Sequence, residues 1–271
     1  MQLAHHPTHT RGLSVKDDMR RIYDRYFSSA DYDARYPHPN HSTLQALWRH
    51  GLKQARQVLD LGCGNGRYAL PLLQHTQAHV TACDISIQAL FGLGERVRHQ
   101  PEWSERLSLV HGDVMALSDA TCYDHMLLLF GVLGHIETRS ARLDTLRRLR
   151  ELAAPDCKLM LTVPSVWRRR PLEALQSWWS HRQTRGDWHD IHFARTIDRH
   201  RVRFFYHLYG LNELRHELKL SGWRVTHAEV ESVLPEWWIT QRPWLNRLDA
   251  LCARACPAAW GYGIRVVART A

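Results

Sequence analysis

Three glycines at alternating positions, Gly62, Gly64 and Gly66, follow an apolar run directly. Glycine tolerates positive φ and has no Cβ atom, so a ligand can approach the backbone closely at such a loop. A phosphate-binding loop would continue with Lys and Ser or Thr, whereas Arg67 and Tyr68 follow here. The dinucleotide fingerprint G-x-G-x-x-G also differs from the G-x-G-x-G spacing of this loop. The pattern therefore predicts a ligand site and disfavours both of these phosphate sites.

Two acidic residues stand at the ends of the next two apolar runs. Asp84 ends the run "AHVTACD", and Asp113 follows "LSLVHG". The carboxyl ends of parallel strands meet at the edge of the sheet where ligands bind, and carboxylates accept hydrogen bonds from hydroxyl and amine groups. The alternative is that both residues only cap helices. From the residues alone, both the ligand contact and the cap remain open for Asp84 and Asp113.

The segment "VLDLGCGNG" resembles the first motif of the class I S-adenosylmethionine-dependent methyltransferases. The resemblance extends from about Gln57 to Pro164, because "ACDIS", "HGDVM", "LLLFGVLGHI" and "LMLTVP" match the later strands of that family and their loops. A weaker resemblance connects "RFFYHLYGLNELRHEL" to the tRNA wobble-uridine carboxymethyl methyltransferases. Those enzymes commonly carry a double histidine after the fourth strand, where this chain has Gly134 and His135.

The family resemblance implies a site for S-adenosylmethionine as the methyl donor. The glycine loop and Asp60 would surround its methionine part, Asp84 would bind the ribose and Asp113 the adenine. The full set of cofactor-binding residues that the resemblance implies is Asp60, Gly62, Gly64, Gly66, Asp84, Ile85, Asp113, Val114, Phe130 and Tyr26.

Methyl transfer requires alignment of donor and acceptor and the exclusion of water. A general base is needed only where the acceptor must lose a proton. His135 is the first candidate, because the loop after the fourth strand faces the transferred methyl group in the family. Tyr206, His207 and His192 are further catalytic candidates, and for each the alternative is a structural role.

The elements that would position these residues alternate between strands and helices from Gln57 to Leu161. This alternation predicts an α/β fold with a doubly wound, seven-stranded, mostly parallel sheet, the Rossmann-like arrangement of the methyltransferases. We expect an N-terminal tail and helical lid at 1–50 and a methyltransferase domain at 51–271. Two insertions on the acceptor side are expected at about 165–205 and 235–260. Tyrosines of the lid, Tyr26 among them, would cover the cofactor, and Pro71 should disturb the helix after the glycine loop.

The cysteine spacing and the apolar runs limit which metal sites and membrane segments the chain can contain. Six cysteines lack the paired spacing of zinc ribbons or disulfide frameworks, and "HDIH" has no third ligand at a recognisable spacing, so no metal is expected. The N-terminus has no apolar leader and no apolar run is long enough to span a bilayer, which predicts a cytoplasmic protein without a transmembrane segment.

The sequence leaves the identity of the methyl acceptor open. The net charge of +9 is concentrated in an arginine-rich segment at 139–203, which suits RNA, an anionic substrate or a lipid surface. Tryptophan, leucine and arginine mix in both insertions, which favours a small-molecule or lipid-like acceptor, with peripheral membrane contact as a further option. The alternatives are a tRNA wobble-uridine methyltransferase and a non-catalytic S-adenosylmethionine-binding protein.

Overall fold

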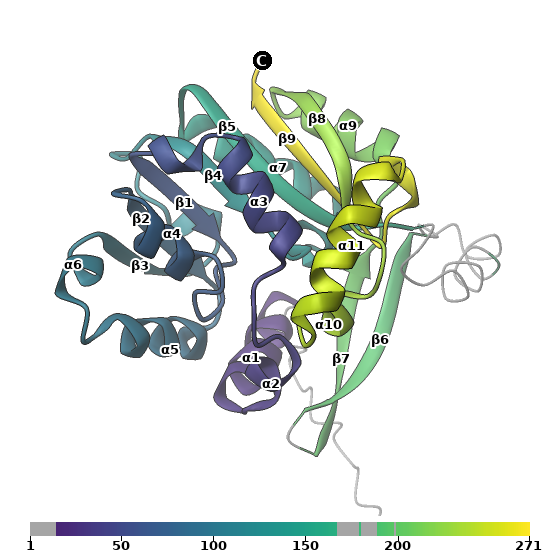
Figure 1. Cartoon of the computed structure of the whole chain (residues 1–271), viewed down its shortest axis with the longest axis horizontal. Coiled ribbons are helices and arrows are strands. Elements are labelled where there is room, and N and C mark those ends of the chain that lie inside the picture. The colour runs from purple at the N-terminus through teal and green to yellow at the C-terminus, as the bar shows by residue number, and fades with distance from the viewer. Residues whose placement is uncertain (1–14, 167–178, 180–188, 198) are drawn as a thin grey trace, which may run out of the picture.

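A computed structural model describes residues 15–166, 179, 189–197 and 199–271. Its centre is a seven-stranded sheet with the order β3-β2-β1-β4-β5-β9-β8. The strands are β1 (Gln57–Leu61), β2 (His79–Asp84), β3 (Leu107–His111), β4 (Tyr123–Leu128), β5 (Ala153–Pro164), β8 (Trp223–Ser232) and β9 (Gly263–Thr270). The first five pair in parallel, and β9 runs antiparallel to both β5 and β8. The predicted doubly wound, seven-stranded, mostly parallel sheet is confirmed (Figure 1).

Helices cover both faces of this sheet. The helices α3 (His41–Arg49), α4 (Ala69–His75) and α5 (Ile87–Val97) bury their apolar sides on one face. The helices α7 (Arg139–Glu151) and α9 (Leu211–Leu220) do so on the other, where Leu146 and Leu149 are fully buried as helical spacing predicts. Pro71 lies in the first turn of α4, where a missing N–H costs no hydrogen bond, so the helix is short but starts normally.

A separate antiparallel pair interrupts the chain after β5. The strands β6 (Asp190–Ile197) and β7 (His200–His207) form a hairpin that projects from the sheet beside α10 and α11 (Figure 1). Its two faces differ, because Phe193, Arg195, Phe204 and Tyr206 share one face and His192 lies on the other. The remainder of the first insertion, at 167–178 and 180–188, lies outside the described residues.

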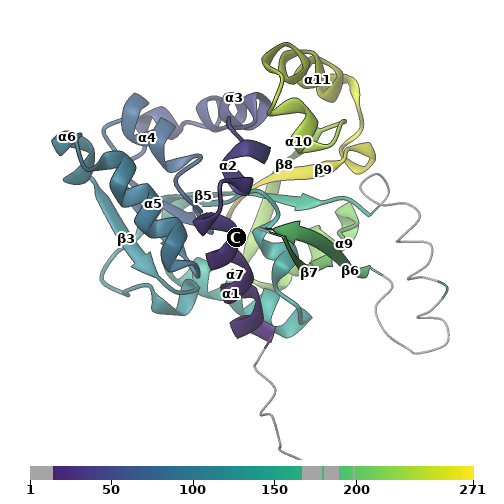
Figure 2. The same cartoon turned by 90° about the horizontal axis from the view of Figure 1, so that it is seen from below.

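The N-terminal helices α1 (Val15–Ser28) and α2 (Asp31–Arg35) lie between α5 and the hairpin in both views (Figures 1 and 2). Tyr26, Tyr32 and Tyr36 are buried there in an aromatic cluster with side chains of the hairpin. We call α1 and α2 the lid. It packs against both α5 and the hairpin.

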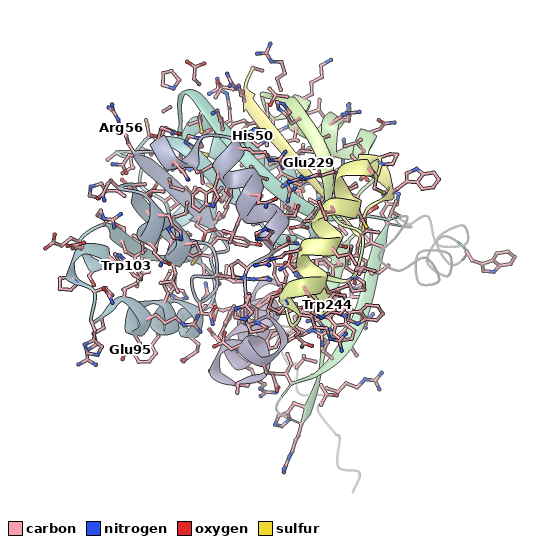
Figure 3. All side chains as sticks on the ribbon, viewed as in Figure 1. His50, Arg56, Glu95, Trp103, Glu229 and Trp244 are labelled. Atoms are coloured by element: carbon pink, nitrogen blue, oxygen red, sulfur yellow. The ribbon has the colours of Figure 1, made fainter. Side chains whose placement is uncertain are left out.

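The second insertion forms α10 (Glu236–Ile239), α11 (Pro243–Ala255) and the 3₁₀ turn η4 (Ala258–Trp260). Trp244, Leu248 and Leu251 recur at helical spacing on α11 and are all exposed; Trp244 is labelled in Figure 3. Among the helices of the described residues, none has the length and apolar character needed to cross a membrane. The other short elements are α6 (Pro101–Ser104), η1 (Leu52–Gln54), η2 (Val114–Ala116) and η3 (Val132–His135).

Candidate active site

The glycine loop leaves the carboxyl end of β1 and is held against β2. The N–H groups of Gly62 and Cys63 both donate to the Cys83 carbonyl, at 2.7 and 3.2 Å. Gly62 has φ +75° and Gly64 has φ +54°, a region that costs a side chain about 1–2 kcal/mol. Added Cβ atoms would lie 2.4 Å from Val132 at Gly62 and 3.0 Å from Phe27 at Gly64. Only glycine therefore lets this backbone lie so close to the side chains of Val132 and Phe27.

Asp60 is a buried carboxylate at the end of β1 with an unfilled hydrogen-bonding capacity. Its side chain is 2% exposed, and no partner among the described residues reaches its Oδ2 atom. Burial, together with the charge of Asp84, raises the pKa of Asp60 to about 7. A buried carboxylate oxygen without a partner is costly, so a cationic ligand group at this point would stabilise it. The α-ammonium group of S-adenosylmethionine supplies such a group, and the residues present fit it.

Asp84 is fixed at the end of β2 by two backbone donors. Its carboxylate accepts hydrogen bonds from the N–H groups of Gly64 and Ser86, both at 2.8 Å. Burial raises its pKa to about 6, although both hydrogen bonds oppose this shift. Asp84 thus links the glycine loop to the first turn of α5. It lies at the end of β2, the position expected of the residue that binds the ribose of the cofactor.

The remaining expected cofactor residues surround the same edge. Asp113 accepts a hydrogen bond from the Met115 N–H and so caps η2, as the capping alternative proposed. Ile85 packs on the aromatic cluster of the lid, whereas Val114 is buried in the core under α7. Phe130 has φ +62° and meets the Tyr36 ring edge to face, 4.8 Å between centroids.

The lid covers the glycine loop with aromatic side chains. Phe27 lies over Gly64 and packs 4.4 Å from Tyr32, ring centroid to centroid. Tyr26 meets Tyr32 edge to face, and its hydroxyl accepts a hydrogen bond from Arg195 at 3.5 Å. A group placed at the Cβ position of Gly64 would therefore meet the Phe27 ring.

His135 is held from both sides in one tautomer. Its Nδ1 lies 3.0 Å from the Phe205 carbonyl oxygen, which can only accept, so Nδ1 carries the proton. Its Nε2 then accepts from the Tyr23 hydroxyl at 2.8 Å. The ring stacks on Tyr206 with 4.0 Å between centroids. This arrangement leaves the lone pair of Nε2 as the basic atom, covered by a residue of the lid.

The other three catalytic candidates occupy different surroundings. The Tyr206 ring is buried beside His135, and its hydroxyl would lie 3.4 Å from a Cβ atom at Gly131. His207 is fully buried and lies between two carboxylates, with Nδ1 2.6 Å from Asp190 and Nε2 2.9 Å from Glu213. Both ring nitrogens therefore donate, and His207 cannot accept a proton in this state.

His192 is exposed on the opposite face of the hairpin from Tyr206. Burial and the charge of Arg203 lower its pKa. The structure therefore brings together His135 and Tyr206 and leaves His192 apart from them.

A cavity of about 260 Å³ opens beyond the lid, between the hairpin and α10. Its walls are Arg35, Tyr36, Phe130, Phe193, Ala194, Arg195, Glu236, Trp237 and Tyr262. Within the described part of the chain, neither Arg35 nor Arg195 pairs with a carboxylate, whereas Glu236 forms an ion pair with buried Arg67 at 3.1 Å. The cavity therefore combines aromatic walls with two guanidinium groups that lack a counter-ion.

This cavity is connected to His135 through stacked rings. Phe193 in its wall stacks on Tyr206 with 5.3 Å between centroids, and Tyr206 stacks on His135.

Three residues of this site, Tyr23, Arg35 and Arg195, are not among the candidates predicted from the sequence. The spacing of Tyr23, Tyr26 and Phe27, three and four residues apart, was the available signal for one aromatic helix face. No comparable pattern in the sequence pointed to Arg35 or Arg195.

Comparisons with known proteins give consistent results. Residues 58–156 match the family described as "Methyltransferase domain". A tRNA1(Val) (adenine(37)-N6)-methyltransferase of Shewanella sp. (strain MR-4) is 26% identical over 107 residues, 38% of this chain and 44% of that protein. This chain thus spans less than half the length of that relative. A putative methyltransferase of Encephalitozoon cuniculi is 26% identical over 168 residues, 62% of this chain and 70% of that protein.

Solved structures share the fold along nearly the whole chain. The CcbJ methyltransferase from Streptomyces caelestis has a TM-score of 0.63 at 16% identity, covering 95% of this chain and 98% of that one. The N-methyltransferase NodS from Bradyrhizobium japonicum, solved with S-adenosyl-L-homocysteine, has a TM-score of 0.60 at 13% identity, covering 94% and 99%. At these identities the likeness concerns the fold.

Proposed function

We propose that this chain, a class I S-adenosylmethionine-dependent methyltransferase by its fold and its matched domain, methylates a small anionic acceptor. The observation that carries the acceptor is the cavity beyond the lid, where Arg35 and Arg195 face aromatic walls without a counter-ion. A carboxylate or phosphate group would pair with these guanidinium groups, and an apolar or aromatic body would contact Tyr36, Phe193 and Trp237.

S-Adenosylmethionine supplies an electrophilic methyl group on a sulfonium, so the carbon–sulfur bond breaks as the bond to the acceptor forms. The chain's own contribution is to bind, align and exclude water. Asp60 would pair with the ammonium group of the methionine part and Asp84 with the ribose hydroxyls. His135 would receive the proton that the acceptor releases, at Nε2.

Lid opening would prepare both parts of the site at once. Phe27 blocks Gly64, and Tyr23 blocks Nε2 of His135. These two residues are four apart on α1 and so lie on the same helix face. One movement of α1 would therefore expose the cofactor loop and free the base.

RNA is the second candidate acceptor. Arg199, Arg201 and Arg203 are exposed on the hairpin, and one group of relatives modifies tRNA. Such a surface would contact phosphates and give a steep salt dependence.

The test is transfer of labelled methyl from S-adenosylmethionine into the small-molecule and RNA fractions of a cell extract. We expect label in anionic small molecules, and we expect Arg195→Gln to reduce incorporation at least about tenfold while Arg201→Gln does not. Label confined to RNA, with loss in Arg201→Gln and steep inhibition by salt, would replace this acceptor with the second candidate.

A further inference from the structure

A cluster of metal-ligating side chains lies at the base of the hairpin, apart from the cofactor loop and the cavity. His189 directly precedes β6, Asp190 begins it, His207 ends β7, and Glu213 lies in the first turn of α9. One ligand atom each from His189, His207 and Glu213 lies within 4.8 Å of the other two. The two ends of the hairpin and the start of α9 thus present two imidazoles and a carboxylate to one point.

The two rings converge on one carboxylate. His189 Nδ1 lies 2.8 Å from Glu213 Oε2, and His207 Nε2 lies 2.9 Å from Glu213 Oε1. Donors around a tetrahedral zinc ion with bonds of about 2.0–2.1 Å stand about 3.3 Å apart. Both nitrogen–oxygen distances are a few tenths of an ångström shorter than this, and all three ligand atoms lie within 4.8 Å of one another, so the side chains must rearrange to surround one ion.

Asp190 is not one of the three ligand residues but contacts one of them, His207. Its carboxylate lies 2.6 Å from His207 Nδ1, and the two residues pair directly across the hairpin. A metal-bound histidine normally donates its other ring N–H to a carboxylate, which fixes the tautomer and makes the ligating nitrogen more basic. His207 has this geometry, with Nε2 directed to the point shared with Glu213 and His189.

We propose that His189, His207 and Glu213 bind a zinc ion, with Asp190 positioning His207. Two histidines and one glutamate suit zinc, and water or another group would fill the fourth position. On binding, Nε2 of His207 gives its proton to solvent and donates its lone pair to the metal, so the charge of the buried imidazolium is replaced by that of the ion. The ion takes no part in methyl transfer.

The site would fix the strand that orients His135. Phe205, two residues before His207 on β7, accepts the hydrogen bond from His135 Nδ1. The His207 carbonyl oxygen would lie 2.9 Å from a Cβ atom at Gly134, so β7 and η3 are in close contact. A metal that joins both strands of the hairpin to α9 holds this contact in register.

The experiment is metal analysis and Co²⁺ titration of the whole chain, purified without a polyhistidine tag. We expect one tightly bound zinc per chain and, after chelation, one equivalent of Co²⁺ with the visible absorption of a tetrahedral site. His189→Ala and Glu213→Gln should abolish stoichiometric binding, and Asp190→Asn should weaken it by about 10–100-fold. His200→Ala, which removes an exposed histidine at the far end of β7, should bind as the wild type does.

Two results would overturn the proposal. One is a folded wild-type chain that binds no stoichiometric zinc or Co²⁺. The other is unchanged binding in both His189→Ala and Glu213→Gln, with circular dichroism showing that these variants are folded. Neither readout depends on methyl transfer, so the metal site and the proposed function can fail independently.

Discussion

Asp60 and Asp84 carry the electrostatics of the site at the scale of single residues. Both are buried carboxylates with raised pKa values, which folding alone does not favour. Such groups mark functional sites more often than structural ones. The glycine pattern and both acidic positions were predictable from sequence, because motif spacing and strand ends fix them. The Tyr23 contact with His135 was not, because it joins residues 112 positions apart.

Binding of S-adenosyl-L-homocysteine should depend on pH through Asp60. Its raised pKa of about 7 means that the carboxylate is largely protonated below that pH and charged above it. We expect affinity to rise from pH 6 to pH 8, by up to about tenfold per unit below the pKa. Calorimetry would measure this, and Asp60→Asn should bind weakly with a much flatter profile. Equal pH profiles in the two proteins would contradict the role of Asp60.

His135→Gln should lower kcat by about 10²–10⁴-fold for an acceptor that releases a proton, because the basic Nε2 atom is lost. Cofactor affinity should change little, since His135 does not contact the glycine loop. Tyr23→Phe, which removes only the hydroxyl over Nε2, should retain most of kcat. Steady-state kinetics with the labelled donor would separate these variants, and an unchanged kcat in His135→Gln would exclude it as the base.

At the scale of elements, the central strands of the sheet were predictable because they are apolar runs with turn residues at their ends, whereas β8 (WRVTHAEVES) shows only partial alternation. The β6–β7 hairpin lies within the first insertion, where no strands are predicted from the sequence. Its alternation is present in the sequence, with Ile191, Phe193 and Ile197 buried, but Arg195 interrupts the apolar face. That arginine lies between the hydroxyl groups of Tyr26 and Tyr36 and the Phe204 ring of β7, which no local pattern reveals.

Phe27→Ala should increase the association rate of S-adenosyl-L-homocysteine severalfold, because the proposed lid opening moves the ring over Gly64 before the ligand binds. Removing a partly buried aromatic ring should also reduce the free energy of unfolding by about 1–3 kcal/mol. Stopped-flow fluorescence and urea unfolding would measure the two effects. A slower association rate would show that the lid guides the ligand instead of blocking it.

At the scale of the whole molecule, the fold brings the glycine loop after β1 and His135 after β4 to the same edge of the sheet, because these strands are parallel neighbours. The lid and the hairpin, inserted at distant points of the chain, meet over that edge (Figure 2). The net charge of +9 suits an anionic acceptor, whether it is a small molecule or RNA. Charge alone therefore does not select between the two. Among the residues that the structure describes, Arg35 and Arg195 in the cavity have no carboxylate partner, and on this observation we propose the small molecule.

The most direct measurement is calorimetric titration of the chain with S-adenosyl-L-homocysteine, comparing wild type, Gly64→Ala and Gly210→Ala. A Cβ atom at Gly64 would meet Phe27 at φ +54°, whereas one at Gly210 would meet nothing within 4 Å. The account predicts binding by wild type and Gly210→Ala, and a loss of at least about tenfold in Gly64→Ala, or about 1.4 kcal/mol. No binding by the folded wild type, or equal binding by all three, would contradict it.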